Sequence, residues 1–172
     1  ESKRLSETLT MEYYRQYHLD IHIVRIFNTY GPNSQIDDGR MIPNFITQAL
    51  KQKPLIIYGD GSKTRSICYV SDMVDGLMRA MFTPNTTGEV FNLGNTEEHT
   101  VLEYAQTIIQ LCGSSSNILF ETSRVDDPER RRPNIDKAQH ILGWQLHVSM
   151  EEGLKRTIEW FSNHTNQLST IS

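Results

Sequence analysis

Residues 23–27 constrain the fold more than any other part of the sequence. They are dense in β-branched and aromatic residues, which is typical of a strand buried on both faces of a sheet. Asn28 and Thr29 then end the apolar run, and Gly31 and Pro32 turn the chain. In an open α/β sheet, ligands bind at the carboxyl ends of the strands, where such small polar side chains lie. Taken alone, the run fits an ordinary strand and turn equally well.

Residues 35–40 favour the binding interpretation of that strand end. They are polar and contain glycine, which predicts a loop. Pro43 follows where it can begin a helix, because the N–H that proline lacks is not needed in a first turn. This order of strand end, polar loop and helix start favours a ligand site over a plain turn.

Strands and helices alternate along the chain, so the predicted fold class is α/β. Helices are predicted over residues 1–18, 43–52 and 135–142, and after Ser71, Thr100 and Ser149. Strands are predicted over residues 22–28, 54–58, 65–70, 89–93 and 118–121. Glu103 and Glu152 stand three residues after Thr100 and Ser149, which predicts a capping box at the start of each of those two helices.

Two predicted helices carry apolar stripes at helical spacing. The stripe of the first helix consists of Leu5, Leu9 and Tyr13, and the stripe expected to face a core in the third consists of Val74, Leu77, Met78 and Met81. Both stripes predict packing against other parts of a protein.

Composition excludes several classes of protein. The chain has 172 residues, 37% of them hydrophobic, and a net charge of -4 with both signs scattered along it, which gives no nucleic-acid footprint. No apolar run approaches a membrane span, and no signal peptide is visible. Cys68 and Cys112 are too few for a disulfide framework, so a cytoplasmic location is expected. The chain starts without methionine and is expected to be a piece of a longer protein, so a membrane-anchored place in the secretory pathway stays open.

Three tempting motifs fail on inspection. Residues 59–64 resemble a phosphate-binding loop, but Gly and Lys are not adjacent and a strand follows instead of a helix. His18 and His22 have metal-ligand spacing only on a continuous helix, and no other Cys/His cluster exists, so no metal is predicted. Adjacent acidic pairs diverge in a strand or helix, so solvated loops are favoured over acid/base dyads.

The first residues resemble a known catalytic motif. Glu1-Ser2-Lys3-Arg4, opening a helix before a buried strand, is similar to the end of the Tyr-x-x-x-Lys motif of the short-chain dehydrogenase/reductase superfamily. The Tyr of that motif would lie two residues before Glu1. Further landmarks resemble the extended branch of the superfamily, the NAD-dependent nucleotide-sugar epimerases, dehydratases and decarboxylases; they are residues 25–32, 54–59, 64–65, 69–72 and 92–95.

Within that branch, the chain is most similar to the UDP-glucuronate decarboxylases, also called UDP-xylose synthases. Residues 36–40, 95–100 and 126–135 carry this similarity, and the resemblance as a whole runs from residue 1 to about residue 161. The chain departs from the pattern at Ser2 and Asn33, where Gly and Arg are commoner. Asn33 weakens the match, since it sits in the loop beside the cofactor.

The resemblance implies two parts of a larger enzyme. Residues 1–35 would be the C-terminal remnant of a Rossmann-type NAD-binding domain, and residues 36–172 would form mainly a smaller α/β domain that binds the nucleotide-sugar substrate. The Gly-rich fingerprint, most of the parallel sheet, the catalytic Tyr and the Ser/Thr–Glu that assist it belong to an N-terminal half that these residues do not include. The fragment alone is therefore expected to be inactive.

The resemblance also implies a reaction. Hydride passes from C4 of the sugar of UDP-glucuronate to NAD, the resulting 4-keto sugar loses its carboxylate as carbon dioxide, and the returning hydride gives UDP-xylose. The alternatives left open are a UDP-glucose 4-epimerase or a dTDP-glucose 4,6-dehydratase, which share most landmarks. From another class, a non-catalytic module that binds nucleotide sugars also stays open.

Lys3 is the one catalytic residue that the resemblance assigns to this chain. A Tyr with an ordinary pKa of about 10 is a poor base at neutral pH, and a nearby ammonium favours its phenolate. Lys3 would supply that ammonium and would also bond the cofactor ribose. Thr29 and Arg40 resemble residues near the cofactor. The alternative for Lys3 is a solvated side chain on a helix.

The remaining site residues are assigned to the substrate. The predicted substrate-binding residues are Tyr13, Gln16, Asn28, Leu55, Tyr58, Arg65 and Arg131. Arg65 and Arg131 are expected to hold the pyrophosphate, because a guanidinium donates two parallel hydrogen bonds to phosphate. Alternatives stay open for three of these assignments: a homodimer contact through helix 1–17 for Tyr13, a plain edge strand for residues 55–58, and a solvated loop for residues 130–132.

Overall fold

The computed structural model describes residues 1–36, 39–122 and 130–168, and for residues 130–131 and 165–168 it describes the backbone only. The helices are α1 (Ser2–Tyr17), α2 (Met41–Leu50), α3 (Val70–Phe82), α4 (Val101–Leu111), α5 (Asp136–Leu142) and α6 (Met150–Leu168). The strands are β1 (Ile23–Ile26), β2 (Thr29–Tyr30), β3 (Leu55–Tyr58), β4 (Thr64–Arg65), β5 (Cys68–Tyr69), β6 (Val90–Leu93), β7 (His99–Thr100), β8 (Ile118–Glu121) and β9 (Arg130–Arg131). The mixed α/β class predicted from the sequence is confirmed.

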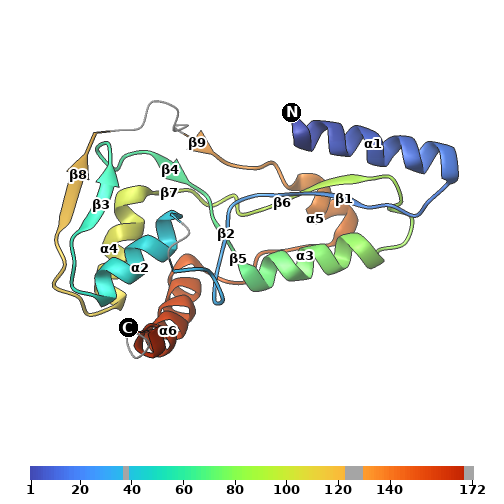
Figure 1. Cartoon of the computed structure of the whole chain (residues 1–172). Helices are drawn as coiled ribbons and strands as arrows, with labels where there is room; N and C mark the ends of the chain where they lie inside the picture. Colours follow the sequence, from blue (N-terminus) through green and yellow to red (C-terminus); the bar gives the residue numbers. More distant parts are fainter. Residues whose placement is uncertain (37–38, 123–129, 169–172) are drawn as a thin grey trace.

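One end of the molecule is built on the parallel pair β1 and β6. Helix α1 lies along one side of this pair, and α3 lies on the opposite side (Figure 1). Helix α5 packs on β6 and α3. This arrangement is the edge of a parallel sheet with helices on both faces, as a Rossmann-type domain requires.

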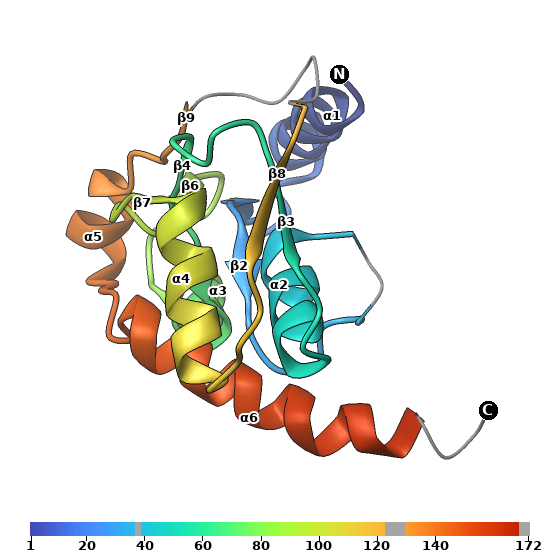
Figure 2. The ribbon, with the colours of Figure 1, turned by 90° about the vertical axis from the view of Figure 1, so that its left-hand side faces the viewer.

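The other end is built on the parallel pair β3 and β8, with α2, α4 and α6 packed together beside it (Figure 2). Between the two ends lie two short-stranded sheets, the pair β2–β5 and the sheet β7–β4–β9. The prediction of one strand over residues 65–70 is wrong. Residues 66 and 67 carry the chain from one sheet to the next, so β4 and β5 belong to different sheets.

Two hydrophobic clusters fill the two ends. The cluster beside β1 and β6 consists of Cys68, Met73, Ala80, Phe91, Leu93, Ile135, Ala138, Leu142 and Trp144. The larger cluster includes Tyr30, Ile46, Leu55, Tyr104, Leu154 and Phe161. The packing therefore does not follow a single boundary near residue 35, because segments between residues 68 and 144 pack at the end that holds β1.

The predicted helix boundaries are confirmed at several ends. The Thr100 hydroxyl accepts the Glu103 N–H at 3.1 Å, and the Glu103 carboxylate accepts the Thr100 N–H at 2.6 Å. The bond from the Thr100 N–H, together with one that the Thr100 hydroxyl donates to the same carboxylate, holds the pKa of Glu103 below its usual range. Helix α5 ends at Gly143, whose φ of 59° is the left-handed conformation that glycine adopts at little cost.

Helix α1 buries none of its residues. Leu5, Leu9 and Tyr13 are 59%, 51% and 56% exposed, so the predicted stripe is present and has no partner among the described residues. Strand β1 shows the same incompleteness: within the part of the chain that the structure describes it pairs with β6 on one side only, and Ile26 is 57% exposed. The expectation that β1 is buried on both faces is therefore not met in this chain.

Helix α3 turns inward a face that overlaps only partly with the predicted one: Leu77 packs against the core cluster as predicted, but Val74 is 52% exposed. Met78 and Met81 are 53% and 61% exposed, whereas Met73, Gly76 and Ala80 are buried. The inward face of α3 carries small residues because the helix approaches β6 closely. A Cβ on Gly76 would lie 2.7 Å from a methyl group of Leu93. In the described part of the chain, no helix combines the length and apolarity needed to span a bilayer.

Candidate functional site

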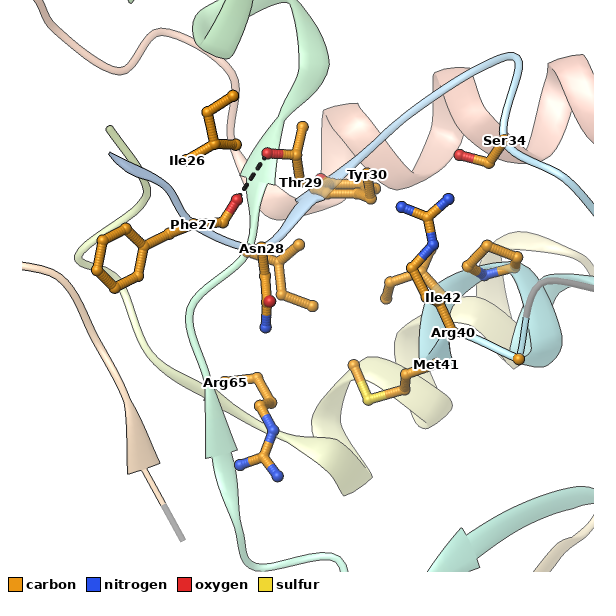
Figure 3. A pocket seen from close by; sticks show the side chains of 13 residues that line it. Ile26, Phe27, Asn28, Thr29, Tyr30, Ser34, Arg40, Met41, Ile42 and Arg65 are labelled. Atoms are coloured by element: carbon orange, nitrogen blue, oxygen red, sulfur yellow. Dashed lines mark hydrogen bonds between the residues drawn. The ribbon is translucent and has the colours of Figure 1, made fainter. Parts of the chain in front are cut away.

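A cavity of about 570 Å³ opens where β1 ends. Figure 3 shows Asn28 and Arg65 on one side of it, and Arg40 and Met41 on the facing side. Its lining comes from the end of β1 with β2, from the loop and first turn of α2, and from the segment that follows β4; the residues are Ile26–Tyr30, Ser34, Gly39–Pro43, Arg65 and Ile67. Four of the predicted site residues thus meet in one hollow: Asn28, Thr29, Arg40 and Arg65.

The turn after β1 fixes Asn28 and Thr29. The backbone carbonyl of Asn28 accepts the N–H of Cys68 at 2.8 Å, and the Thr29 hydroxyl donates to the carbonyl of Phe27 at 2.9 Å. Because the backbone of Asn28 is held by Cys68, its exposed side chain is directed into the cavity (Figure 3). The polar end of the strand therefore presents small polar side chains to the cavity, and their binding of a ligand stays a prediction.

Arg65 enters the cavity from a well-supported strand. Strand β4 runs between β7 and β9, and the carbonyl of Arg65 accepts the Tyr104 hydroxyl at 3.4 Å. The residue is only 8% exposed, and its Nη1 donates to the carbonyl of Thr64 at 2.7 Å. A buried guanidinium beside an open cavity is a strong site for an anion, since little water screens it.

Arg40 supplies a second cation from the facing side. It is the N-cap residue of α2, and its carbonyl accepts the N–H of Asn44 at 3.1 Å. Its side chain is exposed and is drawn beside Ser34 in Figure 3. The cavity therefore joins two guanidinium groups, one amide and three hydroxyl-bearing side chains to the apolar side chains of Met41 and Ile42. Such a lining fits a ligand that carries phosphates and also an apolar ring.

The backbone register places Arg131 beside Arg65. Strands β4 and β9 are parallel, with Thr64 opposite Arg130 and Arg65 opposite Arg131. The two arginines predicted to share the pyrophosphate are thus neighbours across one strand pair. Residues 37–38 and 126–129, which belong to two of the stretches that resemble the decarboxylases, lie outside the described residues.

Helix α1 carries Lys3, Tyr13 and Gln16. All three are exposed, and none of them lines the cavity. Helix α1 is tied to β1 by a two-pronged ion pair: Arg25 donates from Nε and Nη2 to the two carboxylate oxygens of Glu7, at 2.8 and 2.7 Å. This contact holds the pKa of Glu7 below its usual range. Lys3 stands one helical turn before Glu7, so the ion pair sets its position relative to the strand that ends at the site.

Leu55 and Tyr58 do not line the cavity. Leu55 is 0% exposed and belongs to the larger hydrophobic cluster, so its placement gives no support to the prediction that its side chain lines the uridine. Tyr58 is 42% exposed at the other end of β3. Sequence reasoning also missed Ser34, Met41 and Ile67 as lining residues. The only available signal for them was their closeness to Arg40 and Arg65 in the sequence.

Comparison with known proteins gives a consistent family. The family model described as GDP-mannose 4,6 dehydratase matches residues 1–157. UDP-glucuronic acid decarboxylase 2 of Arabidopsis thaliana is 47% identical over 161 residues, which are 94% of this chain and 36% of that protein. UDP-glucuronic acid decarboxylase 1 of Danio rerio is 49% identical over 162 residues, which are 94% of this chain and 38% of that protein.

Solved structures agree with these relatives. An epimerase from Methanothermobacter thermautotrophicus superimposes with a TM-score of 0.92 at 36% identity, over 98% of this chain and 51% of that one. The UDP-glucuronic acid 4-epimerase of Bacillus cereus, in complex with UDP-glucuronic acid and NAD, gives a TM-score of 0.84 at 31% identity, over 92% of this chain and 50% of that one. The chain thus spans about half the length of these structures and less than half of the two decarboxylases.

Proposed function

Because the chain belongs to the GDP-mannose 4,6 dehydratase family of NAD-dependent nucleotide-sugar enzymes, we propose that the complete protein decarboxylates UDP-glucuronate to UDP-xylose through a 4-keto intermediate. Identity near one half to proteins named UDP-glucuronic acid decarboxylase is the observation that carries this proposal. The convergence of Asn28, Thr29, Arg40 and Arg65 on one cavity supports it from the structure.

The residues present fit a dinucleotide at the carboxyl end of β1. Thr29 and Arg40 line the cavity there, where open α/β sheets bind their cofactors. Bound NAD would accept and return a hydride. Lys3 would bond the cofactor ribose and favour the phenolate of a Tyr from the rest of the protein.

The substrate would be held by the arginines and by helix α1. Arg65 and Arg131 would bind the pyrophosphate, and Asn28 would contact the phosphates or the sugar. Tyr13 and Gln16 would reach the nucleotide sugar once the remainder of the protein closes the site over α1. Tyr58 would border the uridine from β3. A 4-keto group beside the carboxylate at C5 makes the loss of carbon dioxide favourable, because the ketone takes up the electrons that the carboxylate leaves behind.

The proposal also covers the domain organisation of the chain. Residues 1–35 would complete a Rossmann-type NAD-binding domain, and most of residues 36–172 would form the substrate domain. The pair β1–β6 with α3 and α5 supports an extension of the first part to segments beyond residue 35. A homodimer through α1 is also proposed, on the strength of its unburied apolar stripe. The two cysteines, which are free thiols, fit a cytoplasmic location.

The test is to incubate the complete protein with UDP-glucuronate and NAD and to look for UDP-xylose and carbon dioxide. UDP-glucose and dTDP-glucose are offered in parallel reactions. Formation of UDP-xylose supports the proposal. Formation of UDP-galactose, or of a 4-keto-6-deoxy sugar, would instead identify the epimerase or the dehydratase as the activity.

Binding measurements on this chain and on the complete protein test the non-catalytic alternative. Residues 1–172 alone are expected neither to bind NAD tightly nor to turn over substrate; the open edge of β1 and the unburied apolar face of α1 support this expectation. Calorimetry on this chain should therefore detect no micromolar binding of NAD. Nucleotide-sugar binding by a complete protein that shows no turnover would favour the binding module.

A further inference from the structure

Glu98 stands out among the acidic residues because its side chain contacts both β4, which carries Arg65, and Arg132, which directly follows Arg131. Its side chain is 18% exposed, whereas that of the adjacent Glu97 is 61% exposed. One carboxylate oxygen accepts the Thr64 hydroxyl at 2.9 Å. The other lies 4.0 Å from a guanidinium nitrogen of Arg132. The carboxylate thus reaches β4 on one side and the residue that follows β9 on the other.

The strand geometry connects these contacts to the cavity. Thr64 and Arg65 are successive residues of β4, so their side chains leave the strand on opposite faces. Holding Thr64 on one face therefore fixes how Arg65 leaves the other face. The same strand pairing sets Arg131 beside Arg65, and Arg132 follows Arg131 directly.

We propose that Glu98 is a positioning residue, which joins β4 to the end of β9 through Thr64 and Arg132 and so holds Arg65 and Arg131 side by side to bind a nucleoside diphosphate. The inference rests on the proposed function only in the class of ligand. The hydrogen bond to Thr64 contributes more than the contact with Arg132. The latter is long and half exposed, and such pairs add at most about 1 kcal/mol.

A charge role and a positioning role for Glu98 predict opposite changes in the affinity for an anionic ligand, which makes the inference testable. A negative charge near the arginines repels phosphate, so if Glu98 acted by charge alone its neutralisation would tighten binding. If it acts by positioning, loss of its contact with Thr64 weakens binding. Thr64→Val removes the hydroxyl at nearly constant shape and leaves every charge in place.

The experiment measures the affinity of the complete protein for UDP by calorimetry, in Thr64→Val, Glu98→Ala, Glu98→Gln and the double variant Thr64→Val/Glu98→Ala. Thr64→Val and Glu98→Ala are each expected to weaken UDP binding about 3- to 10-fold, as loss of one hydrogen bond predicts. Glu98→Gln should lose less, because its amide oxygen still accepts from Thr64. The double variant should bind no more weakly than Glu98→Ala, because both changes remove the same contact.

Two further measurements separate positioning from a general structural effect. NAD affinity should stay within about 2-fold of the unmodified protein, and with the enzyme's substrate the KM should rise while kcat is unchanged. Glu97→Gln is the matched control, since it removes the same charge one residue away. It should change neither KM nor kcat.

The inference is overturned if Thr64→Val and Glu98→Ala both leave UDP affinity unchanged, if Glu98→Gln and Glu98→Ala tighten binding while Thr64→Val has no effect, or if NAD affinity falls in parallel with UDP affinity. Failure of the proposed function gives a different result. In that case UDP-glucuronate is not converted to UDP-xylose, whereas the UDP affinities of the variants still report on Glu98.

Discussion

The indole nitrogen of Trp144 donates a 2.8 Å hydrogen bond to the backbone carbonyl of Asp72, and both residues are almost wholly buried. The Asp72 carboxylate in turn accepts the N–H groups of His147 and Val148, each at 3.0 Å. The segment between α5 and α6 is thereby fixed to the first turn of α3. One buried acid thus satisfies two backbone donors that have no strand to pair with.

Asp72→Ala should therefore be strongly destabilising. It leaves the part-buried N–H groups of His147 and Val148 without their acceptor, and we expect the free energy of unfolding to fall by about 2–3 kcal/mol. Asp75→Ala, on the same helix, is the matched control. It breaks a half-exposed ion pair with Arg79 and should cost less than about 1 kcal/mol. Urea unfolding of the complete protein measures both, and equal losses would contradict the role given to Asp72.

Arg65→Lys and Arg131→Lys should weaken substrate binding in the complete enzyme by on the order of 1–3 kcal/mol each. Lysine keeps the charge but cannot donate two parallel hydrogen bonds to a phosphate. Steady-state constants for UDP-glucuronate measure the effect, and NAD affinity should barely change. Arg156→Lys, which alters a surface pair with Glu152 on α6, is the control. Unchanged constants in both site variants would refute the pyrophosphate assignment.

Lys3→Met should reduce kcat of the complete enzyme by about 100-fold or more, in line with the loss of a group that supports acid–base catalysis. NAD affinity should also fall, because the ammonium is expected to bond the cofactor ribose. Arg4→Met removes a neighbouring exposed cation and should leave both quantities nearly unchanged. A Lys3→Met enzyme that keeps kcat within a few-fold of normal would show that the side chain is merely solvated.

Stability should fall as the pH rises above about 9. Burial raises the pKa of the Cys68 thiol from 9.0 to about 12 and that of Cys112 to about 11, and it also raises the pKa values of Tyr30 and Tyr104. The folded protein then holds protons that the unfolded chain releases, so each thiol lowers the free energy of unfolding by up to about 1.4 kcal/mol per pH unit. For Cys68 this loss extends from about pH 9 to about pH 12.

Urea unfolding at pH 8, 9 and 10 measures this slope. Cys68→Ala should be less stable at pH 8, because it empties part of a packed core, but its stability should fall less steeply with pH. An equally steep fall in Cys68→Ala would mean that the buried thiol does not contribute.

Leu9→Glu should convert the proposed homodimer of the complete protein to a monomer. The substitution places a charge in the middle of the stripe that Leu5 and Tyr13 extend on either side, and a desolvated, unpaired carboxylate strongly opposes association. Sedimentation at micromolar concentration distinguishes the two states. Thr8→Glu adds the same charge at an exposed position about 100° around α1 from Leu9, and this variant should remain dimeric. A monomer in the unmodified complete protein would remove the proposal.

Most of the fold could be predicted from the sequence because its signals are local. The Thr100–Glu103 capping box and the end of α5 at Leu142 depend on residues close together in the chain. The face of α3 could not be predicted. Met78 and Met81 form the more apolar stripe, yet the small side chains of Gly76 and Ala80 are inside, because only distant strands and Trp144 decide how closely the helix packs.

The same difference between local and distant signals applies to the residues of the site. Asn28 and Thr29 follow from the end of one strand, so local sequence was sufficient. The burial of Leu55 could not be predicted, because the run 55–58 is apolar throughout and such a run does not show which alternate side chains point inward. Arg65 and Arg131 meet through a strand pairing across more than sixty residues of chain, and that pairing leaves no local pattern in either segment.

The two hydrophobic clusters have an interleaved connectivity, since the chain enters the cluster around Trp144 and leaves it again more than once on its way to α6. Neither end of the molecule corresponds to one continuous length of polypeptide. A single proteolytic nick in a connecting loop should therefore release no separate domain, and the two pieces should stay associated until both clusters open. For the same reason the two ends should unfold in one cooperative transition, so a substrate-binding part could not be obtained by simple truncation.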